Sequence, residues 1–226
     1  MDKKMLKKCL GLLGISFISV LVFSGTVRAD TLTIYPAMDT NLNANSPNYN
    51  CGSFHTINVG SSNAPSDFHS ILKFDFSTLP TGATITAATL SLYAYSIWVN
   101  DPVGRTYWAY ELTQTGWVEL EATWNSYKSG SGWATAGGDY TTGNGASTTV
   151  PANPGWINWN VLALCQHFQS AHGKIAHFLI KDSVDGSSTW FGAYIMSKDV
   201  GDITLEPKLV ITYNAPLQKG DFFLLF

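Results

Sequence analysis

Charged residues are scarce in this chain of 226 residues, where Asp, Glu, Lys and Arg together make up 13%. The 13 basic residues are outnumbered by 16 acidic ones, and five of the basic residues lie within positions 1–29. Beyond position 29 the balance is 8 basic against 15 acidic residues, a net charge of −7. This balance excludes a nucleic-acid-binding module that works through bulk positive charge. Intrinsic disorder is also excluded, because 45% of the residues are hydrophobic.

Catalytic motifs are lacking as well. The sequence contains no Gly-x-Ser-x-Gly elbow, no P-loop and no dinucleotide-binding fingerprint. Among its four glutamates, Glu119 and Glu121 would share one strand face, at the spacing of about 5 Å that retaining glycosidases use. Such neighbours on an exposed strand more often form a solvated face, so we predict that the protein is not an enzyme. The less favoured alternative is a polysaccharide lyase or hydrolase with Tyr or His as its base.

Metal-binding motifs are weak. Asp39-Thr-Asn-Leu-Asn43 places oxygen ligands at alternate positions, but Ala44 and Asn50 stand where an EF-hand needs glycine and glutamate. A single structural calcium held by Asp39 and Asp139 is the candidate cofactor that remains. The histidines at 167, 172 and 177 are spaced by five residues, which places them on different faces of a regular helix or strand. They also lack the His-Glu-x-x-His arrangement, so zinc is not predicted.

The N-terminus has the features of a secretory signal peptide. Four lysines within residues 3–8 precede an apolar run, residues 10–23, and Val-Arg-Ala29 offers a cleavage site. The run is shorter than the roughly 20 residues that a membrane-spanning helix needs. We therefore expect a signal peptide at 1–29, one domain at 30–214 and an apolar tail at 215–226. The mature protein would be secreted and would have no membrane contact.

Cysteine is rare, with three in the chain. Cys9 would be removed with the signal peptide, which leaves Cys51 and Cys165 in an exported protein. An even number of cysteines in that setting predicts a disulfide between them. The alternative is two buried thiols that pack like small hydrophobic side chains.

The rest of the chain reads as β-structure. Short alternating segments with turns between them predict strands at residues 31–35, 55–59, 68–76, 85–99, 105–112, 174–181 and 205–213. Residues 129–154 are rich in glycine and predict a loop with short strands. Residues 158–170 predict a short helix or an irregular edge segment. Because no βα units repeat, the fold class is all-β, an antiparallel sandwich of two sheets.

Aromatic residues are abundant, and eight tryptophans lie between positions 98 and 190. Trp117 and Trp124 are predicted to serve the core. Four tryptophans border turns or loops and are candidates for stacking on sugar rings: Trp98, Trp108, Trp133 and Trp190. Four basic or titratable residues are candidates for holding a sugar carboxylate: His69, Lys73, Arg105 and Lys128. The alternative for these is an ordinary solvated side chain.

Five segments in order resemble the bacterial DNRLRE domain: residues 39–60, 71–93, 117–125, 133–140 and 207–213. The most characteristic begins Ile71-Leu-Lys-Phe-Asp-Phe76. Two positions depart from the family pattern, His69 in place of arginine and Cys51 in place of glycine. The resemblance implies a jelly-roll sandwich similar to carbohydrate-binding module family 96, whose members are associated with acidic polysaccharides such as alginate. The expected function is polysaccharide binding without catalysis, and a structural or adhesive surface module is the alternative.

Overall fold

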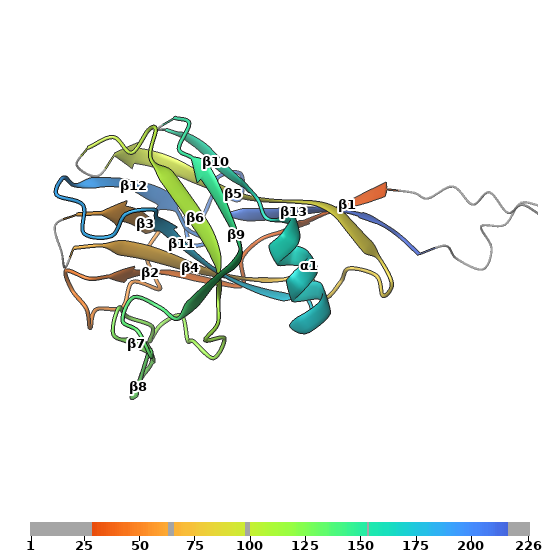
Figure 1. The fold of residues 1–226 in the computed structure, drawn as a ribbon, viewed down its shortest axis with the longest axis horizontal. Coiled ribbons are helices and arrows are strands. Elements are labelled where there is room, and N and C mark those ends of the chain that lie inside the picture. The colour runs from red at the N-terminus through yellow and green to blue at the C-terminus, as the bar shows by residue number, and fades with distance from the viewer. Residues whose placement is uncertain (1–28, 63–65, 98–99, 153, 217–226) are drawn as a thin grey trace, which may run out of the picture. The chain divides into compact units, whose positions relative to one another are not determined.

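The computed structural model describes residues 29–62, 66–97, 100–152 and 154–216 (Figure 1). Residues 1–28 of the predicted signal peptide, most of the predicted tail and Trp98 lie outside these residues. Among the residues that the structure describes, no helix is long and apolar enough to span a membrane.

The described chain is almost entirely β-structure. Its strands are β1 (Ala29–Ile34), β2 (Met38–Asn43), β3 (Thr56–Ser61), β4 (Phe68–Asp75), β5 (Thr84–Ile97), β6 (Thr106–Leu112), β7 (Ser126–Lys128), β8 (Ser131–Gly132), β9 (Tyr140–Thr149), β10 (Gly155–Asn160), β11 (Ile175–Asp182), β12 (Phe191–Met196) and β13 (Lys208–Asn214). Its helix is α1 (Leu162–Ala171). The seven predicted strands are present in the described chain, and β2, β7, β8, β9, β10 and β12 lie outside the predicted ranges.

Antiparallel pairing joins eleven strands into one continuous sheet. Its main path runs β1-β13-β5-β12-β3-β4-β11-β6-β9, while β10 pairs with β5 and β2 pairs with β4. The 14-residue β5 bonds to β13 and β10 along most of its length and to β12 at its end. β7 and β8 form a separate hairpin.

The sheet curls so that two halves of it face each other across a larger hydrophobic core. Side chains of β5, β10 and β13 meet those of β4, β6 and β11 there, and Trp159, Phe74 and Phe178 are among the fully buried members. Alternate residues of a strand point to opposite faces. In β11, Phe178 and Ile180 enter the larger core while Leu179 joins a smaller one. The predicted antiparallel β-sandwich is confirmed.

The predicted helix at 158–170 contains both a strand and a helix. β10 carries Trp159 into the larger core, and α1 begins two residues after the strand ends. Leu164, Cys165 and Phe168 are the buried face of α1. The side-chain amides of Gln166 and Gln169 donate to backbone carbonyls at the start of β5, at 3.0 and 2.8 Å. The helix is therefore fixed to the sandwich by packing and by hydrogen bonds.

The segment 129–154, predicted to be a loop with short strands, contains one strand that is longer than expected. Residues 140–149 form the ten-residue β9, an edge strand that pairs with β6. The connection before it, residues 113–139, covers part of the outer face of β4 and β11. Trp117, Ala122 and Trp133 of this connection pack on Leu179 and Ile71, among others, to make the smaller core.

The predicted Cys51–Cys165 disulfide is not formed, because both residues are free, buried thiols. Cys165 lies on α1 in the larger core, whereas Cys51 lies beside Asn41 of β2. Burial raises the pKa of both thiols, that of Cys165 to about 12. Each cysteine therefore behaves as a small hydrophobic side chain, which was the alternative reading.

Candidate functional site

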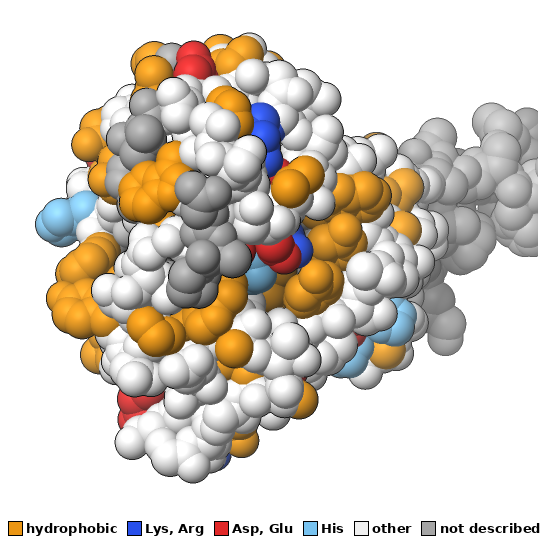
Figure 2. All heavy atoms as spheres, turned by 60° about the vertical axis from the view of Figure 1, so that its left-hand side comes forward, with side chains coloured by type: hydrophobic (Ala, Val, Ile, Leu, Met, Phe, Trp, Pro, Cys, Tyr) orange, Lys and Arg blue, Asp and Glu red, His pale blue; other side chains and the backbone are white. Residues whose placement is uncertain are grey.

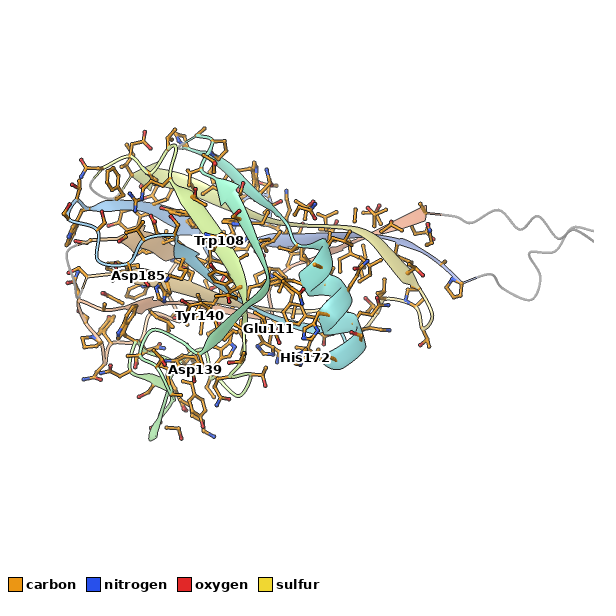
Figure 3. The ribbon with its side chains drawn as sticks, in the orientation of Figure 1. Trp108, Glu111, Asp139, Tyr140, His172 and Asp185 are labelled. Carbon is orange, nitrogen blue, oxygen red and sulfur yellow. The ribbon has the colours of Figure 1, made fainter. Side chains whose placement is uncertain are left out.

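Three aromatic rings stack in a row on the outer face of the sheet. Trp108 and Tyr110 lie two residues apart on β6, so both point to the same side, and Tyr140 begins the neighbouring β9. The ring centroids of Trp108 and Tyr110 are 5.2 Å apart with an angle of 5° between planes. Those of Tyr110 and Tyr140 are 5.0 Å apart at 20°. All three residues are half-buried, and we call them the aromatic stack (Figure 3).

An irregularity in β9 makes room for the middle ring. Ala109 pairs with Ala146 and Glu111 with Thr141, so four residues of β9 bulge opposite Tyr110. Asn144, within the bulge, has a positive φ of 59°, and Gly145 faces the Tyr110 ring. A Cβ atom at position 145 would stand 2.6 Å from two ring carbons of Tyr110. The absence of a side chain at Gly145 therefore lets Tyr110 lie in the stack.

A charged cluster borders the Tyr140 end of the stack. Lys181 of β11 places its Nζ 5.5 Å from the Tyr140 ring centroid and 3.4 Å from the Tyr140 hydroxyl. It also forms an ion pair with Asp185, which comes from the loop after β11 (Figure 3). His69 of β4 lies on the other side of Asp185, with Nε2 3.3 Å from Oδ1. We call Lys181, Asp185 and His69 the polar cluster.

Lys181 and Asp185 of the polar cluster keep their charges at neutral pH. Burial alone would lower the pKa of Lys181, but its hydrogen bond and attraction to Asp185 outweigh this and raise it. Burial would raise the pKa of Asp185, and contacts with His69 and Lys181 lower it instead. Asp185 exposes 44% of its side chain, so a ligand can reach it. Figure 2 shows acidic, basic and histidine side chains gathered beside hydrophobic ones near the middle of the visible face.

Two of the sequence-predicted ligand residues, Trp108 and His69, lie in this site. His69 is buried, and its Nδ1 contacts the carbonyl of Gly137 at 2.7 Å. Its ring also lies 4.9 Å from that of Trp124. His69 therefore contacts Asp185 from below the surface. The sequence did not identify Tyr110, Tyr140, Lys181 or Asp185. The alternation of Trp108 and Tyr110 was a usable signal, because residues two apart on a strand share a face.

Other predicted ligand residues have different surroundings. Trp133 exposes 7% of its surface and donates from Nε1 to the carbonyl of Thr123 at 2.8 Å, so it is part of the smaller core. Arg105 makes a bidentate ion pair with Asp182, in which Nε and Nη2 donate to the two carboxylate oxygens at 2.5 and 2.8 Å. Its guanidinium group also lies over the Phe191 ring. Both residues are occupied by contacts within the protein.

The remaining predicted ligand residues lie outside the stack and the polar cluster. Lys73 is half-buried on β4, where it is the register partner of His177. Lys128 is on β7, with Nζ 5.6 Å from the Tyr127 ring. Trp190 is half-buried in the loop before β12, and its carbonyl accepts a hydrogen bond from Asn100. Trp124 packs against the smaller core and Trp117 lies within it, as predicted.

The predicted calcium ligands do not fall in one group of the described chain. Asp139 uses both carboxylate oxygens to accept the backbone N–H groups of Ala134 and Thr135, at 2.9 and 2.7 Å. Asp39 is buried and groups with Glu119 and Asp199, whose carboxylate oxygens lie within 4.8 Å of one another. Lys198 already places its Nζ 3.3 Å from Glu119 and 2.8 Å from Asp199. The Lys198 ammonium therefore already offsets part of the negative charge of these carboxylates.

The glutamates considered for catalysis do not form a pair. Residues 119–121 form a turn rather than a strand. Glu119 accepts the backbone N–H of Asp39 at 2.8 Å, and Glu121 accepts that of Ser129 at 2.8 Å. The Glu119 carboxylate thus ties the turn to β2, and the Glu121 carboxylate ties it to the turn that follows β7.

Comparison with known proteins gives one family match. The profile of carbohydrate-binding module family 96 matches residues 30–213, which include the aromatic stack and the polar cluster. A search of curated proteins finds no match to the chain.

Proposed function

Because the chain belongs to carbohydrate-binding module family 96, we propose that its aromatic stack binds a polysaccharide and leaves the polymer intact. The row of Trp108, Tyr110 and Tyr140 is the observation that carries this proposal. Sugar rings present C–H faces that pack on aromatic rings. Tyr110 is enclosed by its two neighbours, so Trp108 and Tyr140 are the outer rings, each with one face turned away from the stack.

The polar cluster complements the stack as a hydrogen-bonding partner. A sugar hydroxyl both donates and accepts, and Lys181 and Asp185 offer a donor and an acceptor side by side. They lie next to the Tyr140 hydroxyl, which can do either. An apolar surface with a few convergent polar groups is the usual composition of a site for a small or chain-like ligand.

For the ligand class we retain the acidic, alginate-like polysaccharide. Lys181 beside Tyr140 is the cation that would meet a sugar carboxylate. Asp185 pairs with Lys181 in the free protein, so a sugar carboxylate would take the place of Asp185 at the Lys181 ammonium. A neutral polysaccharide would leave that pair intact and bind through its hydroxyls.

Affinity electrophoresis distinguishes an acidic polysaccharide ligand from a neutral one. The protein is run through gels that contain alginate or hydroxyethylcellulose, at low and at about 0.3 M salt, where exposed charges are strongly screened. We expect retardation in alginate that weakens with salt. Retardation in hydroxyethylcellulose alone would reject the acidic ligand, and no retardation in a wider glycan array would favour a structural or adhesive module. New reducing or unsaturated ends in the polysaccharide would indicate an enzyme.

Trp108→Ala is the direct test of the stack. We expect at least about a tenfold loss of affinity, or ~1.4 kcal/mol, because the sugar loses an outer aromatic ring. The matched control is Trp156→Ala: Trp156 is also half-buried, but on β10, where it contacts Tyr93 and Lys208. Equal losses in the two variants, or a larger loss in Trp156→Ala, would contradict the assignment of the site.

Export of the chain belongs to the same proposal. Residues 1–29 have the sequence features of a signal peptide, and the family match begins at residue 30. The mass of the protein recovered from the culture medium should correspond to a chain that starts at Asp30. A cell-associated protein that retains Met1–Ala29 would contradict this.

A further inference from the structure

Three side chains with metal-binding atoms converge at the junction of β6 and α1. Glu111 is on β6, His167 is on α1 and His172 immediately follows the helix (Figure 3). The Nε2 atom of His172 lies 3.0 Å from one carboxylate oxygen of Glu111, and that of His167 lies 3.4 Å from the other. The two Nε2 atoms are 3.3 Å apart. We propose that Glu111, His167 and His172 form a binding site for a divalent transition metal, with Zn²⁺ the favoured ion.

The spacing of the three ligand atoms fits this coordination. In a tetrahedral zinc site with bonds of about 2.0–2.1 Å, ligand atoms stand about 3.3 Å apart. The two Nε2 atoms stand 3.3 Å apart, which matches this value, and each lies 3.0–3.4 Å from one of the two carboxylate oxygens of Glu111. With one ligand atom taken from each residue, the three atoms lie within 4.8 Å of one another, so a small rotation of the Glu111 carboxylate would complete one face of a tetrahedron.

The end of α1 explains why a spacing of five residues works here. A spacing of five residues separates His167 and His172 onto different faces only within a regular helix or strand. The helix ends at Ala171, and His172 has φ −123° and ψ 23°, outside the helical range. Its backbone N–H still bonds to the carbonyl of Phe168. The chain thus turns at His172 and its imidazole meets that of His167, 5.1 Å away between ring centroids.

Burial of Glu111 adds an electrostatic reason to expect a metal ion at this site. Its side chain is 9% exposed, whereas those of His167 and His172 are 37% and 34% exposed. A buried carboxylate needs a positive partner, and imidazole binds metals in its neutral form. A divalent ion would neutralise Glu111 while both histidines stay neutral. Nearby, burial and the Lys73 ammonium of β4 lower the pKa of His177 on β11 to about 4, so His177 is neutral at pH 7 and Lys73 is the nearby positive charge.

The ligand set selects the class of ion. Two imidazole nitrogens and one carboxylate suit zinc and its neighbours in the transition series, whereas calcium and magnesium prefer oxygen ligands. Three protein ligands leave the fourth position to water, and the exposed histidines keep that position open to solvent. This site is separate from Asp39 and Asp139, the two residues predicted to hold calcium.

Titration of the full chain with Co²⁺ and Zn²⁺ tests the proposal. Co²⁺ bound to a tetrahedral site should give visible absorption bands at one ion per chain, and Zn²⁺ should remove them by displacement. His167→Asn and His172→Asn alter half-exposed residues, so the fold should survive. Each should weaken Zn²⁺ binding, measured by calorimetry, by at least about 10–100-fold, since even an indirect partner of a metal ligand contributes that much.

His55→Asn is the matched control. His55 is exposed and contacts the carbonyl of Asp199, so its loss should leave Zn²⁺ affinity unchanged. Circular dichroism of every variant establishes that it is folded. Absence of stoichiometric Co²⁺ bands in the wild-type chain would overturn the proposal. So would Zn²⁺ binding that His172→Asn leaves unaltered, because the metal would then lie elsewhere.

Discussion

At the scale of single residues, Asp39 combines deep burial with two carboxylate neighbours. Burial raises its pKa from the ordinary 3.8 to about 7; the Lys198 N–H at 2.7 Å opposes this rise, and Glu119 and Asp199 add to it. Its pKa in the folded chain thus exceeds that in the unfolded chain, so the folded state holds an additional proton between about pH 4 and pH 7. The contribution of Asp39 to stability is complete below this window and is lost as pH rises through it.

Asp39→Asn should remove this pH dependence. Asparagine keeps an oxygen that can accept the Lys198 N–H but cannot ionise. We expect the variant to gain unfolding temperature relative to wild type as the pH rises from 4 to 8, with EDTA present so that no metal contributes. Thermal unfolding of both proteins at each pH measures the difference. A difference that stays constant across the range would contradict the expectation.

At the scale of elements, the bulge in β9 should control the aromatic stack. Gly145→Ala places a methyl group 2.6 Å from the Tyr110 ring, so the ring must move and the stack must open. We expect weaker polysaccharide binding with a modest change in stability, because Gly145 lies on an edge strand with Tyr110 half-buried. Affinity electrophoresis and thermal unfolding measure the two effects.

Gly143→Ala is the control within the same bulge. Its added Cβ would lie 3.7 Å from the Thr141 hydroxyl, an ordinary contact distance. Both substitutions remove one glycine from β9, so both change backbone entropy in the same way. If the two variants bind equally well, the packing of Gly145 against Tyr110 does not control the site.

Strands with regular alternation could be predicted from the sequence, and bulged or polar ones could not. β5 was found because the apolar residues Leu90 and Leu92 alternate with the polar residues Thr89 and Ser91, so its apolar face is visible in the sequence. β9 reads Tyr-Thr-Thr-Gly-Asn-Gly and lacks that pattern, because its bulge interrupts the alternation and it lies at the edge of the sheet. β2 was missed because Asp39, Thr40 and Asn41 are polar yet buried.

The sequence predicted an aromatic candidate site but not which residues come together in it. Loop tryptophans were chosen for sugar contact, yet Trp133 lies in the smaller core and the stack stands on strands. Tyr140 joins Tyr110 across 30 residues of chain through the pairing of β6 and β9. Lys181 and Asp185 reach the stack through the pairing of β11 with β6. Such contacts depend on strand order, which a single sequence does not reveal.

At the scale of the whole molecule, the fold holds together without a disulfide. The larger core draws side chains from both halves of the sheet and from α1, and Cys165 is one of its packed members. Apolar burial at roughly 25 cal/mol per Å² is therefore the main stabilising contribution.

A thiol count tests this directly. The full chain, unfolded without reductant, should react at three thiols, those of Cys9, Cys51 and Cys165. Its unfolding temperature should be the same with and without reductant. A single reactive thiol, or a lower unfolding temperature in reductant, would show that Cys51 and Cys165 are bridged.

The pairing of β1 with β13 has a consequence for protein engineering. Asp30, the first residue of the proposed mature chain, and Tyr213 are register partners in this antiparallel pair, so their Cα atoms stand about 5 Å apart. A domain whose two ends are neighbours can be inserted into a surface loop of a host protein without separating the two ends of that loop. Joining the two ends through a short glycine-rich linker should likewise permit new termini elsewhere, for example between β7 and β8. The same binding surface could then be displayed in an orientation chosen by the designer.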